Sequence, residues 1–271
     1  MLISINTGLY SARPGKPRYD ICDAMDFYAE AGFEAVDVNL TAVVYQDPYD
    51  HEPALDGDWR ATMEKLKKRI DANGLVVSHT HIPFRYKDRP GENFYEDPMM
   101  LRSIEASGLL GAPYAVFHPF YDREAGIYIE KTLDVYAPMA EAAKQVGVTL
   151  ALENMPAGSL DDLITIADQL DCVFCWDSGH ANLAGHSQAE SIRKLGSRLK
   201  VLHLHDNYGI TDNHNSPYFG NIDWEEIVSA LKEIGYEGTF NYEVSCPKFP
   251  EGVRMDHARY LVTTAKLLLG R

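Results

Sequence analysis

The chain has 271 residues, with 25 Lys and Arg against 40 Asp and Glu and a formal net charge of −15. This length suits two average domains or one large α/β barrel, and we expect a single domain over residues 1–271. The negative charge repels phosphate backbones and anionic membranes, so it argues against nucleic-acid and membrane partners. No apolar run approaches the ~20 residues that span a bilayer, and the N-terminus shows no charged leader, so we expect a soluble, cytoplasmic protein.

Apolar strand-like segments and amphipathic helical patterns alternate along the chain. The strand candidates are residues 2–7, 34–40, 75–82, 114–119, 148–154, 173–178, 199–205 and 239–245, and the helix candidates are 19–31, 58–72, 97–110, 128–146, 160–170, 188–195, 223–234 and 254–269. Gly32, Gly74, Gly111, Gly147 and Gly235 each follow a helical pattern, where a left-handed residue commonly ends a helix. These alternations predict a single (β/α)8 TIM barrel, with a doubly wound open sheet as the alternative.

Four successive strand candidates end in a side chain that can bind a metal ion. Glu153, Asp177, His203 and Glu243 each close an apolar run. An unpaired carboxylate in such a place is costly unless a cation or hydrogen bonds compensate it. Three carboxylates and an imidazole suit one divalent cation with oxygen and nitrogen ligands. The pattern therefore favours an enzyme.

Further polar side chains stand at or near other strand ends, where a TIM barrel builds its active site. Any one histidine there is better explained as a buried, hydrogen-bonded imidazole. Convergence of polar residues at so many strand ends makes that explanation insufficient for the whole set. The additional residues of this kind are Asn6, Asn39, His79, His81, His118, Asn154, His180 and His205.

Several of these motifs resemble the xylose-isomerase-like TIM barrel superfamily, which contains sugar and sugar-phosphate isomerases and epimerases together with endonuclease IV. The resemblance covers nearly the whole chain. It depends on the motifs taken together in this order, because each alone is weak. The motifs are Leu152-Glu153-Asn154, Trp176-Asp177-Ser178-Gly179-His180, His203-Leu204-His205-Asp206 and Tyr242-Glu243-Val244.

The resemblance implies one manganese, cobalt or magnesium ion bound by Glu153, Asp177, His203 and Glu243. His203 is favoured over His205 because the family ligand stands three residues before an acidic residue, as His203 does before Asp206. It also implies a divalent-metal-dependent isomerase or epimerase of a sugar or sugar phosphate. Glu153 and Glu243 would move a proton beside the carbonyl through an enediolate. His180 would hold a substrate oxygen or support Asp177.

An endonuclease IV-like, multi-zinc phosphodiesterase is a less favoured alternative. His81, His118, His180, Asp212 and His214 resemble the additional zinc ligands of that enzyme. Zinc in one or several sites is therefore an option for the cofactor. The acidic net charge and the lack of a basic surface cluster argue against DNA as the substrate, because a DNA enzyme needs a positive surface facing the phosphates. In a sugar enzyme the extra histidines, including His205, would instead bind sugar hydroxyls.

Two further alternatives remain open from the sequence. A lyase or dehydratase acting on a keto-sugar or keto-glycoside would share the same ligands, and a non-enzymatic binding protein would share the same fold. A basic stretch at Arg85, Lys87 and Arg89 would receive a phosphate or carboxylate, or would simply be a solvated loop. We expect a small carbohydrate as the partner, and a homo-oligomer is possible.

Overall fold

Eight parallel strands form the centre of the structure, a computed structural model that describes residues 1–9, 21–40, 58–84, 95, 98–246 and 249–271. The strands pair in the order β10-β1-β2-β3-β4-β7-β8-β9. A parallel bridge between Leu204 and Tyr242 closes the ring: the Leu204 amide donates to Asn241 (2.9 Å) and the Glu243 amide to Leu204 (3.0 Å). The strands are β1 (Ile3–Asn6), β2 (Ala35–Asn39), β3 (Val76–His81), β4 (Tyr114–Phe117), β7 (Thr149–Glu153), β8 (Val173–Asp177), β9 (Leu199–His203) and β10 (Phe240–Tyr242).

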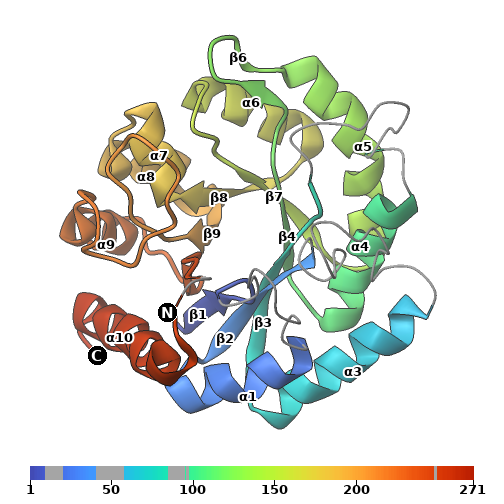
Figure 1. Ribbon diagram of the computed structural model, residues 1–271. Coiled ribbons are helices and arrows are strands. Elements are labelled where there is room, and N and C mark those ends of the chain that lie inside the picture. The colour runs from blue at the N-terminus through green and yellow to red at the C-terminus, as the bar shows by residue number, and fades with distance from the viewer. Residues whose placement is uncertain (10–20, 41–57, 85–94, 96–97, 247–248) are drawn as a thin grey trace.

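Helices surround this barrel (Figure 1). Each predicted helix is present, so the (β/α)8 prediction is confirmed and the open sheet is wrong. The described residues also form elements that were not expected: a short helix directly after β8, a hairpin of β5 (Tyr121–Asp122) and β6 (Gly126–Ile127), and a 3-10 helix at Gly196–Arg198. The helices are α1 (Ile21–Ala31), α3 (Trp59–Ala72), α4 (Pro98–Leu110), α5 (Ile129–Gln145), α6 (Leu160–Leu170), α7 (Ser178–Ala184), α8 (Gln188–Leu195), α9 (Trp224–Glu233) and α10 (Glu251–Leu269).

Helix ends follow the local chemistry of the sequence. All five glycines expected to end helices have positive φ, from 64° at Gly235 to 100° at Gly32. Helix α6 begins with a capping box, in which Ser159 and Asp162 each accept from the other's backbone amide. Asp223 caps α9 by accepting from the Glu226 amide (2.9 Å). These caps set where each helix starts and therefore how long each connecting loop is.

The apolar core is divided between two regions. The larger one lies between the strands and the helices and contains, for example, Trp224, which is fully buried. A small cluster inside the barrel consists of Val116, Ala151, Cys175 and Val201. Beyond it, toward the C-terminal ends of the strands, the inward-facing residues become polar. Among the described residues, none of the helices is long and apolar enough to cross a membrane.

Arg271 links both ends of the chain through Glu34. Its guanidinium donates two hydrogen bonds to the Glu34 carboxylate (2.8 and 2.9 Å) and one to the Met1 carbonyl (3.0 Å). The same carboxylate accepts from the Ile3 amide (2.9 Å) at the start of β1. Chiefly because of Arg271, the pKa of Glu34 is lowered to about 2.

We expect Arg271→Ala to lower the free energy of unfolding by up to about 1 kcal/mol near pH 7, since this partly exposed pair is screened by solvent. A depressed folded-state pKa stabilises the protein above the unfolded-state value of about 4.3 and loses this effect as pH falls toward 2. The difference between wild type and variant should therefore shrink across that window. Urea unfolding of wild type and variant at several pH values measures this difference. In a Glu34→Gln background, the effect of Arg271→Ala on the free energy of unfolding should no longer depend on pH across this window.

Candidate functional site

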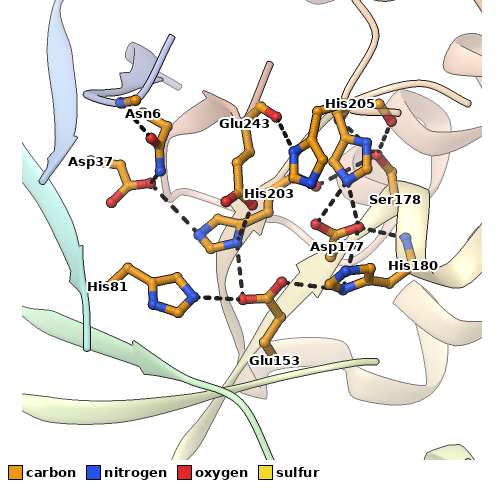
Figure 2. A network of polar contacts seen from close by, with 12 residues as sticks. Asn6, Asp37, His81, Glu153, Asp177, Ser178, His180, His203, His205 and Glu243 are labelled. Carbon is orange, nitrogen blue, oxygen red and sulfur yellow. Dashed lines mark hydrogen bonds and ion pairs between the residues drawn. The ribbon is translucent and has the colours of Figure 1, made fainter. Parts of the chain in front are cut away.

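Four strands bring their last residues together at the C-terminal end of the barrel. Glu153, Asp177 and His203 end β7, β8 and β9, and Glu243 directly follows β10. One potential ligand atom from each of the four lies within 4.8 Å of the others. The Nδ1 atom of His203 is 2.8 Å from Glu243 Oε2 and 3.1 Å from Glu153 Oε2 (Figure 2). The structure thus assembles the predicted ligand set.

The donor atoms of this cluster fit a divalent cation. Glu153 Oε2 and His203 Nδ1 are both buried and, within the described part of the chain, neither makes a hydrogen bond of good geometry. Two ligands that bind one small cation at ~2.1 Å lie about 3 Å apart, close to the separations seen here. Buried carboxylate oxygens beside an imidazole nitrogen suit manganese, cobalt, magnesium or zinc.

Both glutamates are ionised in this setting. Burial disfavours the charge on Glu153, but His203 and His118 more than offset it and hold its pKa well below the usual value. Burial acts the same way on Glu243, and His203 again keeps the pKa of that carboxyl low. Burial alone would lower the pKa of His203, yet Cys175, Glu243 and Glu153 together raise it well above the ordinary value. The cluster therefore presents negative charge to whatever binds it.

The motif Trp176-Asp177-Ser178-Gly179-His180 spans the end of β8 and the start of α7, and its polar residues have fixed partners. Asp177 caps α7 by accepting from the His180 amide through Oδ1 (2.6 Å), and His205 Nε2 lies 3.1 Å from both oxygens of its carboxylate. Ser178 Oγ donates to the His205 carbonyl (2.7 Å) and accepts from the His205 amide (3.0 Å). A Cβ on Gly179 would stand 1.9 Å from the His205 ring, so only glycine fits there.

Within the described part of the chain, three histidines besides His203 contact Glu153. His81 and His118 approach Oε2 through Nε2, at 3.3 and 3.2 Å, and lie 3.1 Å from each other. His180 Nδ1 is 3.3 Å from Oε1 and 2.9 Å from the Asn154 carbonyl oxygen. His81, His118 and Glu153 are close enough to hold a cation by themselves.

Asp212 and His214 extend the cluster toward solvent. Asp212 Oδ2 lies 3.1 Å from His214 Nε2 and 3.4 Å from His180 Nε2. The His214 ring stacks on His205 with centroids 4.0 Å apart, and its Nδ1 donates to the Glu243 carbonyl (2.7 Å). Despite burial, Asp212 and Glu243 raise the pKa of His214 to about 9. His205, Asp212 and His214 form another group with metal-ligand spacing.

Asp206, the acidic residue three positions after His203, makes its hydrogen bonds to residues outside the strand-end cluster. Asp206 is fully buried and accepts from Trp224 Nε1 (3.1 Å) and from the amides of Asn207 (2.9 Å) and Ile222 (3.2 Å). It therefore anchors the loop that carries Asp212 and His214. Arg85, Lys87 and Arg89 lie outside the described residues.

The sequence interpretation missed Asp37, and it placed His79 at a strand end without assigning it to the site. Asp37 lies in the middle of β2, fully buried, and its Oδ2 is 3.4 Å from His79 Nε2 and 3.8 Å from His203 Nε2. Its signal in the sequence was a lone acid inside an apolar run, which resembles an ordinary strand position.

The chain is similar to known proteins both in sequence and in fold. The uncharacterized protein MJ1311 of Methanocaldococcus jannaschii is 32% identical over 243 residues, which cover 82% of this chain and 78% of the relative. A D-psicose 3-epimerase of Enterocloster bolteae is 39% identical over 235 residues, covering 79% and 73%. A crystal structure of a D-psicose 3-epimerase in the presence of D-fructose aligns over 100% of both chains with a TM-score of 0.73 at 16% identity, a similarity of fold.

A family model described as xylose isomerase-like TIM barrel matches residues 25–264. This match covers most of the barrel and the four strand-end residues Glu153, Asp177, His203 and Glu243. The chain therefore belongs to the xylose isomerase-like TIM barrel family.

Proposed function

We propose that this protein is a divalent-cation-dependent sugar isomerase or epimerase. The observation that carries the proposal is the approach of two ionised glutamates to one nitrogen of His203, at 2.8 and 3.1 Å, from strands separated by β8 and β9. Chemistry beside a sugar carbonyl needs such a pair, since one carboxylate removes a proton and the other returns it. The D-psicose 3-epimerase relative supports a ketose as the first substrate to test.

Each group has a defined task in this reaction. Glu153, Asp177, His203 and Glu243 would hold the cation, which, when bound, polarises the carbonyl and the adjacent hydroxyl of the sugar. Glu153 and Glu243 would exchange the proton of the intervening carbon. His180 lies beside Glu153 and Asp212 and would bind a substrate oxygen, while His81, His118, His205 and His214 would bind hydroxyls or further cations.

Two alternatives share this site. A lyase or dehydratase of keto-sugars or keto-glycosides would use the same proton removal but would release water or an aglycone, so product analysis separates it. The groups His81–His118–Glu153 and His205–Asp212–His214 favour a second candidate, a multi-zinc phosphodiesterase similar to endonuclease IV. The net charge of −15 opposes a DNA substrate.

Cation content is the first test. Protein purified without an affinity metal column should carry about one equivalent of manganese, cobalt, magnesium or zinc by plasma mass spectrometry. His203→Ala should weaken Co²⁺ binding about 100-fold or more in calorimetry, because it removes a ligand and leaves two carboxylates facing each other. His186→Ala is the matched control, since His186 contacts the Gly158 carbonyl outside the cluster. Two to three zinc ions would favour the multi-zinc candidate, and no bound cation would contradict the proposal.

Proton exchange tests the two glutamates. Wild-type protein with D-psicose or D-fructose in deuterated buffer should incorporate deuterium beside the carbonyl and form the epimer, both followed by NMR. Glu153→Gln and Glu243→Gln should each lower the rate by about 100- to 10,000-fold, since neither amide accepts the proton. Glu237→Gln, an exposed residue between α9 and β10, should leave the rate unchanged. Normal epimerisation by either active-site variant would refute the assigned roles.

The nuclease alternative makes an opposite prediction. We expect no incision of an abasic duplex at low salt, with or without added zinc, because the acidic surface repels the DNA backbone. Gel analysis of a labelled duplex measures this. Efficient incision that is lost in Asp212→Asn would replace the sugar enzyme with the phosphodiesterase.

A further inference from the structure

A chain of hydrogen bonds begins at an irregularity between β2 and β3. The register shifts between Val36 and Asp37, and the Ser78 hydroxyl donates to the Val36 carbonyl (3.0 Å). A hydroxyl carries one proton, so with that proton engaged, Ser78 Oγ can only accept from its other neighbours. Its other neighbours are Ser4 Oγ at 3.1 Å and His79 Nδ1 at 3.0 Å, so this arrangement places the proton of the His79 ring on Nδ1.

The position of the proton on His79 determines which nitrogen of the neighbouring His203 ring is protonated. A neutral imidazole carries one N–H, so with its proton on Nδ1 the His79 ring has its lone pair on Nε2. His79 Nε2 lies 3.1 Å from His203 Nε2, and a contact this short between two nitrogens needs a proton on one of them. That proton belongs to His203 Nε2. A cation that binds beside Glu153 and Glu243 would displace the other proton of His203 and take the lone pair on Nδ1, the nitrogen that faces both glutamates.

Asp37 supports the same arrangement by its charge. Its Oδ2 accepts from Asn6 Nδ2 (2.6 Å), and the Asn6 amide is oriented because its Oδ1 accepts from the Gly8 amide (2.7 Å). The carboxylate lies beside both Nε2 atoms, where a negative charge favours the proton between them. Asp37, His79 and His203 also have cation-site spacing, but a carboxylate oxygen already bound by an amide and a proton between the rings describe a hydrogen-bonded network instead.

We infer that Asp37 and His79 are positioning residues that fix the tautomer of His203, so that its Nδ1 lone pair is directed at the strand-end ligand cluster. The inference rests on the proposed cation site. Neither residue touches the substrate or the cation. A histidine ligand generally needs such a partner on its other nitrogen, and loss of that partner weakens cation binding by about 10- to 100-fold.

The tautomers can be read directly by long-range ¹H–¹⁵N NMR. In protein without added metal, His79 should show a proton on Nδ1 and none on Nε2. After one equivalent of Zn²⁺ is added, His203 should show a proton on Nε2 and a metal-shifted Nδ1. A proton on His79 Nε2, or zinc on His203 Nε2, would overturn the inference.

Affinity measurements complete the test. Asp37→Asn and His79→Leu should each weaken binding of the first equivalent of Co²⁺ by about 10- to 100-fold, followed by its visible absorption. Thr80→Val is the matched control: it removes a buried hydrogen bond of β3, between Thr80 Oγ1 and Ser107 Oγ (2.6 Å), away from His203. Its affinity should stay near that of wild type.

The outcomes separate the two proposals. If wild-type protein binds no cation but His79 has the expected tautomer, the proposed function fails while the hydrogen-bonded chain stands. If wild type binds Co²⁺ and both variants bind it equally well, the positioning role fails while the cation site stands. Loss of affinity in Thr80→Val as large as in the two variants would also refute the positioning role, since it would show a general effect of weakening β3.

Discussion

The Glu153 carboxylate is the constraint on which the site depends. Its side chain is about 1% exposed, and burying such a charge without compensation is very costly. Among the described residues, four histidines, from three strand ends and from α7, approach its two oxygens, and His203, His118 and His180 hold its pKa low. The second nitrogens of His81, His180 and His203 in turn contact the Ile82 carbonyl, Asp212 and His79, which form a layer of polar groups behind these rings. The polar end of the barrel is thus organised outward from one acid.

The barrel supplies the geometry that makes this compensation possible. Residues two apart on a strand point to the same side, so β3 directs both His79 and His81 inward, and His205 continues the line of His203 past the end of β9. The inner residue of each pair meets the buried network, and the outer one lies nearer the mouth of the barrel. A closed ring of parallel strands then places all their C-terminal ends at one mouth. The alternation of side chains along each strand and the closure of the barrel together create a site with two layers, the buried network and the residues at the mouth.

Much of the fold and the meeting of the candidate ligands at one end of the barrel were predictable because both depend on local patterns. Glycines after helices and apolar runs ending in acids are visible in the sequence, and parallel topology then brings the acids together. Other features depend on contacts that the sequence does not show. The contacts of Asp37 with His79 and His203 lie next to a register shift between β2 and β3, and helix α7 is too short for its periodicity to be recognised. Asp206 was read as a marker of the metal ligand, whereas its contacts are with Trp224 and the following loop.

Gly179 has a consequence that extends beyond its own position. The His205 ring occupies the space that any larger side chain at 179 would need, so residues 179 and 205 compete for one volume. His205 in turn supports Asp177 and stacks on His214, so the exclusion reaches a proposed cation ligand and the solvent-facing edge of the site. A relative with a side chain at the first position must therefore carry something smaller than imidazole at the second. Variation at these two positions is physically coupled, and redesign of this mouth of the barrel has to change them as a pair.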